Sequence, residues 1–320
     1  MSTLLQEQKQ SLRLMQASGS TSLGTTLPDH ILDAFTAAAA AGDIDAVRAL
    51  LKEHFFDGST YLIYELYPIF SQAARHDQVE IVEQIFAMQE PLTFATEDFV
   101  AREAIDTGSE KILLFFLSHG WDINQRIHPG LNVLETLLHT GAQDRDMVVW
   151  LISHGASLNE RPRHKDITGM SQAVEHTSLD LVRELVDHWG GDVCRGQLLH
   201  YALQRKSRAL SGTESQSKPA AASDIVEMLG LLLERGAPLN LTLYANDEVS
   251  SRNYRVLDLG TPLHEAAQMG HVEAVRYLLE QGADTTIVST RSKTTALAWA
   301  EKAGHRDVVA MLGSLDQYKL

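Results

Sequence analysis

The stretch that decides the fold is TPLHEAAQMGHVEAVRYLLEQGAD, residues 261–284. It predicts two short helices joined by a sharp turn. Thr261 can cap the first helix, and Pro262 suits its first position. Gly270 permits the turn and Gly282 ends the second helix, because glycine adopts left-handed backbone angles without strain. Apolar residues recur at helical spacing in the second helix, which predicts one buried face. They are Val272, Val275, Leu278 and Leu279.

The same pattern recurs along the chain. It returns after 34 residues (295 − 261), where Thr295 matches the helix start, Gly304 the turn and Leu312 the end of the second apolar stripe. Weaker copies precede it, at about residues 38–51, 73–85, 104–122, 134–157, 170–192 and 198–238. A unit of two short helices cannot bury its apolar faces alone, so such a repeat predicts a stack with a continuous core.

This pattern resembles the ankyrin repeat family, over roughly residues 29–315. The resemblance implies an all-α ankyrin-repeat solenoid of about eight units, with stacked helix-turn-helix pairs and β-hairpin finger loops. It also implies a concave face made by the fingers and the first helices. The histidine of the Thr-Pro-Leu-His tetrapeptide makes structural hydrogen bonds in the family. We therefore expect structural roles for His264 and for His200, its counterpart in the weaker copy.

Breaks in the period define the expected organisation. Residues 1–28 form a flexible N-terminal segment or a cap, residues 29–315 form the array, and residues 316–320 are a tail. A linker-like loop at residues 206–223 interrupts the sixth unit between its helices. Residues 241–259, which we call the long finger, extend the loop before the best repeat. Long loops on rigid scaffolds often carry function.

Composition and charge exclude several classes of protein. The formal net charge of −15 repels a phosphate backbone, so we expect no nucleic-acid partner. No apolar run reaches the length of a membrane span, so we expect no membrane partner. The one cysteine, Cys194, cannot form an internal disulfide or a cysteine-rich zinc site. Without a secretory signal, the chain reads as intracellular, either cytoplasmic or nuclear.

Register along the repeats predicts which side chains share one surface. Positions equivalent to Glu265, Gln268 and Met269 of the best unit should face the groove, and they are mostly polar or ionisable. Aromatic and charged groups together suit recognition of a protein or peptide. The predicted partner-binding residues are Arg75, His76, Glu103, Asp106, His139, His176, Tyr201, Arg205, Glu265 and Trp299, with Tyr244, Asp247, Arg252 and Tyr254 of the long finger.

The sequence therefore predicts a non-catalytic scaffold or adaptor that holds a protein or peptide on the groove and the finger loops. The excess of Asp and Glu over Lys and Arg favours a basic partner, whose binding should weaken as the salt concentration rises. The oligomeric state stays open. No cofactor is expected, because phosphate-binding loops are absent, and no metal, because no first helix carries a His-x-x-x-His pair.

An enzyme or small-molecule-binding accessory protein is the alternative. Carboxylates beside imidazoles can do general acid–base work, as in a lyase, isomerase or cyclase. The residues in that case would be His139, His176, Glu103, Asp106 and Glu175. An enclosed apolar pocket with a desolvated histidine or carboxylate would favour the enzyme, and an open wet groove the adaptor.

Overall fold

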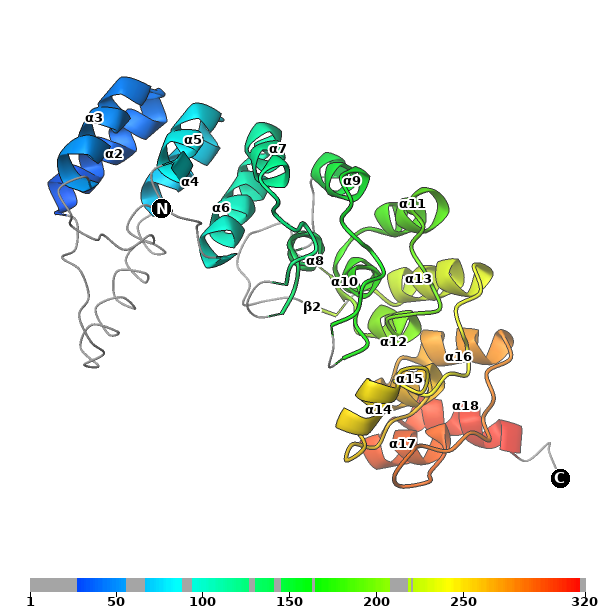
Figure 1. Cartoon of the computed structure of the whole chain (residues 1–320). Helices are drawn as coiled ribbons and strands as arrows, with labels where there is room; N and C mark the ends of the chain where they lie inside the picture. Colours follow the sequence, from blue (N-terminus) through cyan, green and yellow to red (C-terminus); the bar gives the residue numbers. More distant parts are fainter. Residues whose placement is uncertain are drawn as a thin grey trace, which may run out of the picture. The chain divides into compact units, whose positions relative to one another are not determined.

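The computed structural model describes residues 28–55, 67–87, 94–126, 130–140, 145–162, 165–207, 218–219 and 221–316. They fall into two compact units, which we call unit 1 (Met1–Asp122) and unit 2 (Ile123–Leu320). Both consist of antiparallel helix pairs that follow one another in chain order (Figure 1). The predicted flexible segment lies outside the described residues except for Pro28, and so does the tail after Asp316.

The described part of unit 1 contains three helix pairs. They are α2 (Asp29–Ala41) with α3 (Ile44–Phe55), α4 (Tyr67–Arg75) with α5 (Val79–Ala87), and α6 (Phe94–Thr107) with α7 (Glu110–Ser118). First helices pack on first helices and second on second, so each pair buries its apolar stripe against the next. The fully buried Phe35, Phe70 and Phe116 fill this core.

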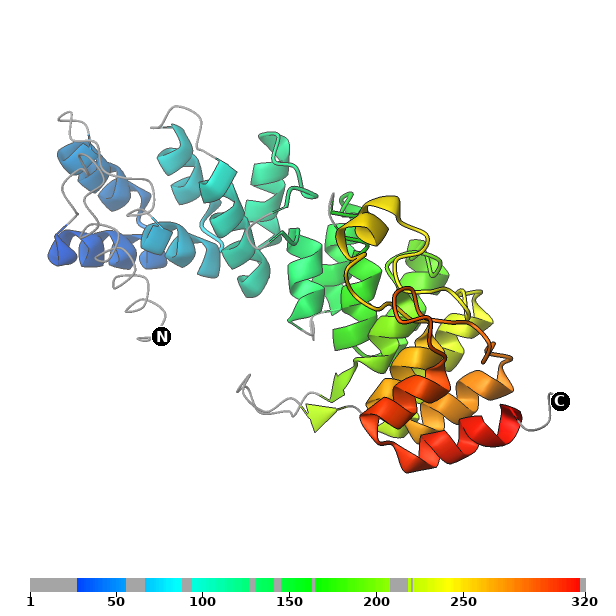
Figure 2. The same cartoon turned by 90° about the horizontal axis from the view of Figure 1, so that it is seen from below.

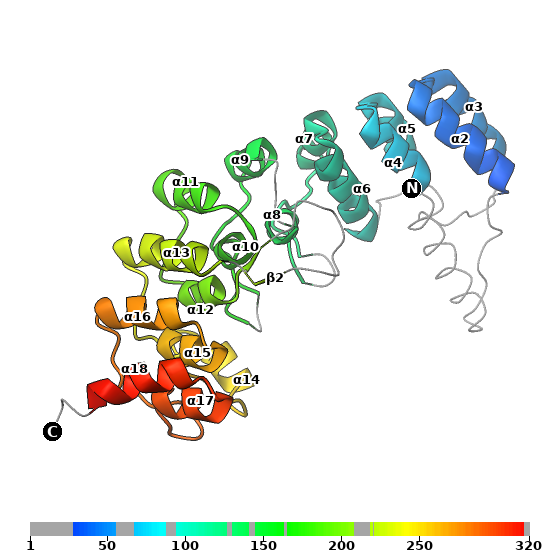
Figure 3. The same ribbon diagram turned by 180° about the vertical axis from the view of Figure 1, so that it is seen from behind.

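The described part of unit 2 contains five pairs. They are α8 (Val133–His139) with α9 (Arg145–Ser153), α10 (Gly169–His176) with α11 (Leu179–Trp189), α12 (Leu198–Leu203) with α13 (Ala222–Glu234), α15 (Pro262–Met269) with α16 (Val272–Glu280), and α17 (Ala296–Ala303) with α18 (Arg306–Asp316). Seen from behind, the second helices α9, α11, α13 and α16 follow in a row (Figure 3). The first helices also pack in sequence and form a surface that we call the first-helix wall.

Helix α12 ends at Leu203 and α13 begins at Ala222, and residues 204–221 separate them. The ends of this segment form a short antiparallel pair, β1 (Lys206–Ser207) with β2 (Lys218–Pro219), in which Lys206 lies opposite Pro219. Helix α13 begins at Ala222, two residues earlier than the loop boundary that the sequence predicts. Residues 208–217 lie outside the described residues.

The tetrapeptide behaves as its chemistry predicts. The Nδ1 atom of His264 accepts hydrogen bonds from the backbone amide (3.2 Å) and the hydroxyl (2.9 Å) of Thr261. Its Nε2–H then donates to the carbonyl of Thr294 in the next loop (3.2 Å). His200 likewise donates from Nε2 to the carbonyl of Gly260 (3.2 Å). The predicted structural roles of His264 and His200 are therefore confirmed: each histidine ties its helix start to the following loop.

The turn glycine is required for two reasons. Gly270 has φ of +72°, in the left-handed region that favours glycine. A Cβ atom at this position would also lie 2.5 Å from the ring of His305. That ring donates from Nε2 to the carbonyl of Gln268 (2.9 Å), which links the turn between α15 and α16 to the next repeat.

Loss of the buried imidazole should weaken unit 2. In His264→Ala the buried amide of Thr261 loses its partner and the carbonyl of Thr294 keeps only the amide of Ser289, which should lower the free energy of unfolding by about 1–3 kcal/mol. Urea denaturation followed by circular dichroism measures the change. The exposed His188 on α11 is the control, and His188→Ala should shift the free energy by less than about 0.5 kcal/mol. Equal effects of both variants would contradict the structural role.

Candidate binding surface

In unit 1 the predicted wall residues form one ion pair and leave two groups exposed. Arg75 donates from Nε to Oε1 of Glu103 (2.7 Å), across α4 and α6. Glu103 is buried, so this pair holds neighbouring repeats together. His76 and Asp106 are exposed. Partial desolvation raises the pKa of the Asp106 carboxyl, while Arg102 opposes the shift.

The first-helix wall of unit 2 brings two predicted imidazoles together. The rings of His139 and His176 meet edge to face, with centroids 4.5 Å apart. His139 donates from Nδ1 to Oε1 of Gln172 (2.8 Å), which fixes its ring. His176 lies 3.5 Å from the carboxylate of its neighbour Glu175. Three members of the alternative acid–base set, His139, Glu175 and His176, therefore lie together in unit 2, whereas Glu103 and Asp106 belong to α6 of unit 1.

Further along the wall, the Glu265 carboxylate forms no ion pair with any residue that the structure describes. Its Oε1 accepts a hydrogen bond from Nε2 of Gln204 (2.5 Å), which is a neutral donor. Burial raises the pKa of Glu265 to about 7, and the bond from Gln204 lowers it only in part. Tyr201 is buried, and burial together with Tyr244 and the nearby carboxylates raises the pKa of its phenol. These groups give the wall a water-poor acidic spot.

Trp299 lies one repeat beyond Glu265 on the same wall and is half-buried. Its indole Nε1–H donates to the hydroxyl of Thr294 (3.2 Å), and its ring meets His264 edge to face at 5.2 Å. One indole face is thereby held in place by the loop that precedes α17. A fixed, partly exposed aromatic ring can contact a partner at little entropic cost.

Arg205 differs from the prediction that it contacts a partner. It is 7% exposed, and its Nη2 donates to the carbonyl of Thr177 (3.1 Å). The same guanidinium pairs with Asp224 at 3.1 Å and also bonds the carbonyl of Val174. Val174 and Thr177 lie at the C-terminal end of α10, where the last carbonyls have no partner within the helix, and the long arginine reaches them. We therefore assign Arg205 to holding α10, α12 and α13 together.

The long finger is folded on itself. Asp247 accepts the backbone amide of Ser250 (2.7 Å) and begins the short helix α14 (Glu248–Asn253). The rings of Tyr244 and Tyr254 stack at 4.9 Å on its inner side. Arg252, by contrast, is exposed and pairs with Glu248 (2.8 Å). Four residues of this finger are predicted to contact a partner. Two of them, Tyr244 and Asp247, make contacts within the finger itself.

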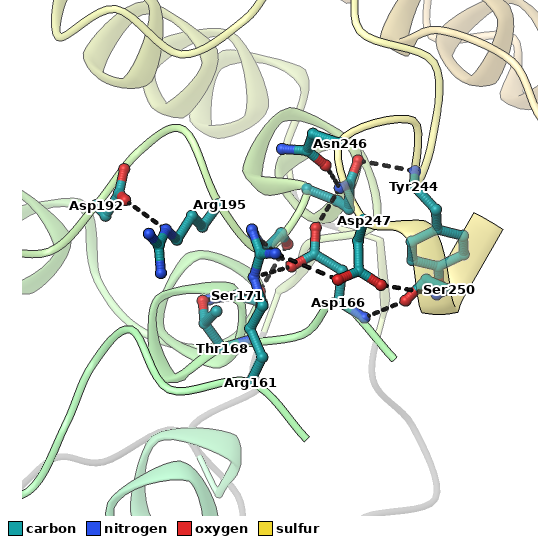
Figure 4. Close-up of polar contacts among 12 residues, drawn as sticks. Arg161, Asp166, Thr168, Ser171, Asp192, Arg195, Tyr244, Asn246, Asp247 and Ser250 are labelled. Carbon is teal, nitrogen blue, oxygen red and sulfur yellow. Dashed lines mark hydrogen bonds and ion pairs between the residues drawn. The ribbon is translucent and has the colours of Figure 1, made fainter. Parts of the chain in front are cut away.

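A buried ionic network ties the long finger to the preceding repeats (Figure 4). Its centre is Asp166, which is 0% exposed. The carboxylate pairs with Arg161 at 2.8 Å and accepts the amide of Gly196 and the side-chain amide of Gln197. Its own backbone amide donates to the hydroxyl of Ser250 in α14 (2.6 Å). The finger is therefore attached at a buried charge.

The same network also bonds residues 244–247 of the long finger. Gln197 donates to Oδ1 of Asn246 (2.7 Å) and accepts the backbone amide of Tyr244 (3.1 Å). Arg161 also pairs with Asp247 at 3.2 Å. Sequence reasoning missed Arg161, Asp166 and Gln197. The residues of the long finger that they bond lie 47–86 residues away along the chain, and no local pattern marks such a pairing.

A second clamp joins the long finger to the next loop, residues 284–294, which we call the C-terminal finger. Asp258 accepts the backbone amides of Arg291 (2.8 Å) and Ser292 (3.0 Å) and also bonds the Ser292 hydroxyl. These donors lower the pKa of Asp258 to about 2, against the opposing effect of burial. Thr290 adds a bond from its amide to the carbonyl of Leu259 (2.9 Å).

Two hollows on unit 2 are lined by described residues other than the predicted acid–base set. One has a volume of about 10 Å³, the size of a water molecule, and is lined by Cys194, Gln197 and His200 among others. The other, of about 530 Å³, is open and lies against Arg306 and Val309 of α18. Among the described residues, no group of three or more His, Cys, Asp or Glu side chains has the arrangement of a metal site. No helix of the described part is long and apolar enough to cross a bilayer.

Comparison with known proteins agrees with this architecture. The family model described as ankyrin repeats (3 copies) matches residues 220–319. Residues 220–319 contain ankyrin repeats. The match covers α13 to α18 and includes the tetrapeptide, while the upstream pairs repeat the same helix–turn–helix architecture.

Among curated proteins, the chain is similar to the serine/threonine-protein kinase TNNI3K of Mus musculus, with 30% identity over 111 residues. That segment is 32% of this chain and 13% of the kinase. TNNI3K of Rattus norvegicus is 35% identical over 68 residues, or 19% of this chain and 8% of that protein. The chain therefore spans a small part of the length of these relatives.

Among solved structures, the ankyrin repeat domain of Bcl-3 aligns with 87% of this chain and 97% of its own. The identity is 19% and the TM-score is 0.41. The fold assignment rests on the helix pairs and the repeat match.

Removing the charge of Asp166 should loosen the long finger without unfolding the stack. In Asp166→Asn the amide cannot replace the charge-assisted bonds to Arg161 and Gln197, so exchange of the Tyr244 and Ser250 amides should quicken by about 10–100-fold. Hydrogen exchange read by mass spectrometry measures this. Glu248→Gln, on the exposed side of the same finger, should leave the protection unchanged. If Asp166→Asn keeps wild-type protection, the network does not hold the finger.

Glu265 should make stability fall as the pH rises. Its pKa is higher in the folded chain than in the unfolded one, so the folded state binds the extra proton and its stabilising effect is lost from about pH 5 to 8. The Glu265→Gln variant has no carboxyl group at this position, so it should not lose this stability. Over the same pH range, its free energy of unfolding should rise relative to that of wild type by up to about 3 kcal/mol. Urea titrations at several pH values test the difference. The exposed Glu273→Gln should run parallel to wild type, and parallel curves for Glu265→Gln would contradict the assignment.

Proposed function

We propose that this protein is a non-catalytic scaffold or adaptor, which binds a protein or peptide on the first-helix wall and the fingers of unit 2. Ankyrin repeats are generally protein–protein interaction modules, which supports the class of function. The observation that carries the proposal is the long finger. A buried ionic network holds it in one conformation, yet Val256 and Leu257 stand in solvent, 63% and 51% exposed. Rigid display of apolar side chains lowers the entropy cost of binding.

The wall contributes a second contact region. Glu265 is desolvated and has no cation beside it among the groups that shift its pKa. A lysine or arginine of a partner that enters beside Glu265 would satisfy the carboxylate and hold it ionised. Trp299 and the exposed Lys302 lie on the next first helix. This is where a basic element of a partner would bind, as the acidic balance of the chain predicts.

The remaining predicted residues fit this proposal in different ways. His76, Asp106, His139 and His176 stay candidate contacts on the first helices. Glu103 is buried and pairs with Arg75, so it acts through the position of that arginine. The exposed thiol of Cys194 supports a reducing compartment, and we place the protein inside the cell.

Site-specific photo-cross-linking tests the proposed surface. A photoreactive benzophenone amino acid replaces Leu257 in the long finger or Lys302 on the wall, and the protein is irradiated in a lysate of the cells that express it. We expect one discrete cross-linked species, the same protein from both positions. The control is Arg183, which is exposed on the second helix α11 and should give none. The same yield from all three positions would overturn the proposed surface.

A further inference from the structure

Exposed aliphatic side chains gather on two neighbouring loops. Val249, Val256 and Leu257 of the long finger are 48%, 63% and 51% exposed, and Val288 of the C-terminal finger is 42% exposed. We call these four residues the finger-tip patch. Figure 2 shows the two loops next to each other beside the helix pairs. Large apolar side chains that cluster in solvent mark a surface that a partner covers.

The two loops are fixed relative to each other. Asp258 bonds the backbone of Arg291 and Ser292, and Arg291 donates from Nη1 to the carbonyl of Val256 (2.8 Å). The network around Asp166 holds the other end of the long finger. The finger-tip patch is therefore preorganised, because both loops that carry it are bonded through their backbones.

Charge around the patch has the opposite sign to the chain as a whole. The exposed cations on residues 241–259 and 284–294 are Arg252, Arg255, Arg291 and Lys293. The exposed acids on the same residues are Glu248, which pairs with Arg252, and Asp284 at the start of the C-terminal finger. Asp247 pairs with Arg161, and Asp258 remains ionised, with its oxygens bonded to the backbone amides of Arg291 and Ser292. A partner would therefore meet a basic rim around aliphatic side chains.

We propose that the finger-tip patch binds an acidic segment of a partner protein, with large apolar side chains between its carboxylates. This inference rests on the proposed function and adds the chemistry of the partner at one surface. The aliphatic side chains would supply buried area, while Arg255, Arg291 and Lys293 select against basic segments. The basic element expected at the first-helix wall and the acidic segment expected here belong to different regions of the partner.

The aliphatic character of the patch favours a peptide over a nucleic acid or an anionic lipid surface. Single-stranded nucleic acids bind on exposed aromatic rings, whereas the finger aromatics Tyr244 and Tyr254 stack on each other. The net charge of −15 also opposes approach of any extended polyanion. A short acidic segment feels mainly the nearby rim, since charges farther away than about 10 Å are screened at moderate salt.

Selection from a phage-displayed random dodecapeptide library on the full chain tests the proposal. We expect selected peptides to be enriched in Asp and Glu beside Leu, Ile or Phe. Synthetic copies should bind more weakly as the salt concentration rises, by fluorescence anisotropy. A selection that yields no acidic peptide would overturn the proposal, whether or not basic peptides bind the first-helix wall. So would competition by a single-stranded DNA oligonucleotide or by phosphatidylserine vesicles that is as strong as competition by the unlabelled peptide.

Matched variants locate the binding surface. Arg255→Glu with Lys293→Glu should weaken binding of the selected peptide about 10-fold or more, since two attractions become repulsions. Val256→Ser with Leu257→Ser should weaken it by a similar factor and leave the salt dependence in place. The control, Arg183→Glu with Arg276→Glu, reverses two exposed cations on the second helices α11 and α16 and should change affinity less than 2-fold. Equal losses in the test and control variants would contradict the location.

The outcomes separate this inference from the proposed function. If a benzophenone at position 257 captures a discrete protein while no acidic peptide is selected, the surface binds a partner of other chemistry and only this inference fails. If neither experiment yields a binder, both fail. If acidic peptides bind and lose affinity in the Arg255 and Lys293 variant, the partner class at this surface is established.

Discussion

Each helix pair in this protein depends on its neighbours, because two short helices cannot bury their apolar faces alone. Burial therefore runs from repeat to repeat, through residues such as Leu134, Met228 and Val275, which are fully buried. This constraint also sets the register of the first helices. Every repeat that stacks correctly presents its next polar position to the same surface, so the wall of unit 2 is a consequence of packing. The side chains on that wall can then vary with little cost to the fold.

Hydrogen bonds between a helix start and the following loop fix the loops relative to the stacked helices. His264 connects Thr261 with Thr294, and Asp258 connects the two fingers through backbone amides. The long finger needs more, because its 19 residues (241–259) are an insertion without a repeat to stack on. The buried Asp166 provides that attachment. A buried charge is costly unless every partner is in place, so the network favours one conformation of the finger over alternatives.

The sequence predicted the fold well, because repeat spacing, turn glycines and the tetrapeptide are local signals. The helix pairs lie where these signals place them, and the roles of His264 and His200 follow from their position. The site was harder to predict. Register places Tyr201 and Glu265 on one wall, but it cannot tell that Arg205 turns inward to bond the carbonyls of Val174 and Thr177. Pairings such as Arg161 with Asp247 join residues 86 positions apart and leave no periodic trace.

The net charge of the chain did not predict the charge of its individual surfaces. The value of −15 counts every carboxylate equally, including those of Asp166 and Asp247, which pair with Arg161 inside the fold, and that of Asp258, which amide and hydroxyl donors stabilise. Once such internal pairs are set aside, the fingers expose mainly arginine and lysine. A partner responds to the charges that remain in solvent within about 10 Å, not to the total of the chain. One protein can therefore present a desolvated carboxylate at Glu265 and a basic rim at its finger tips. A complementary partner would place a basic group at the first and an acidic segment at the second.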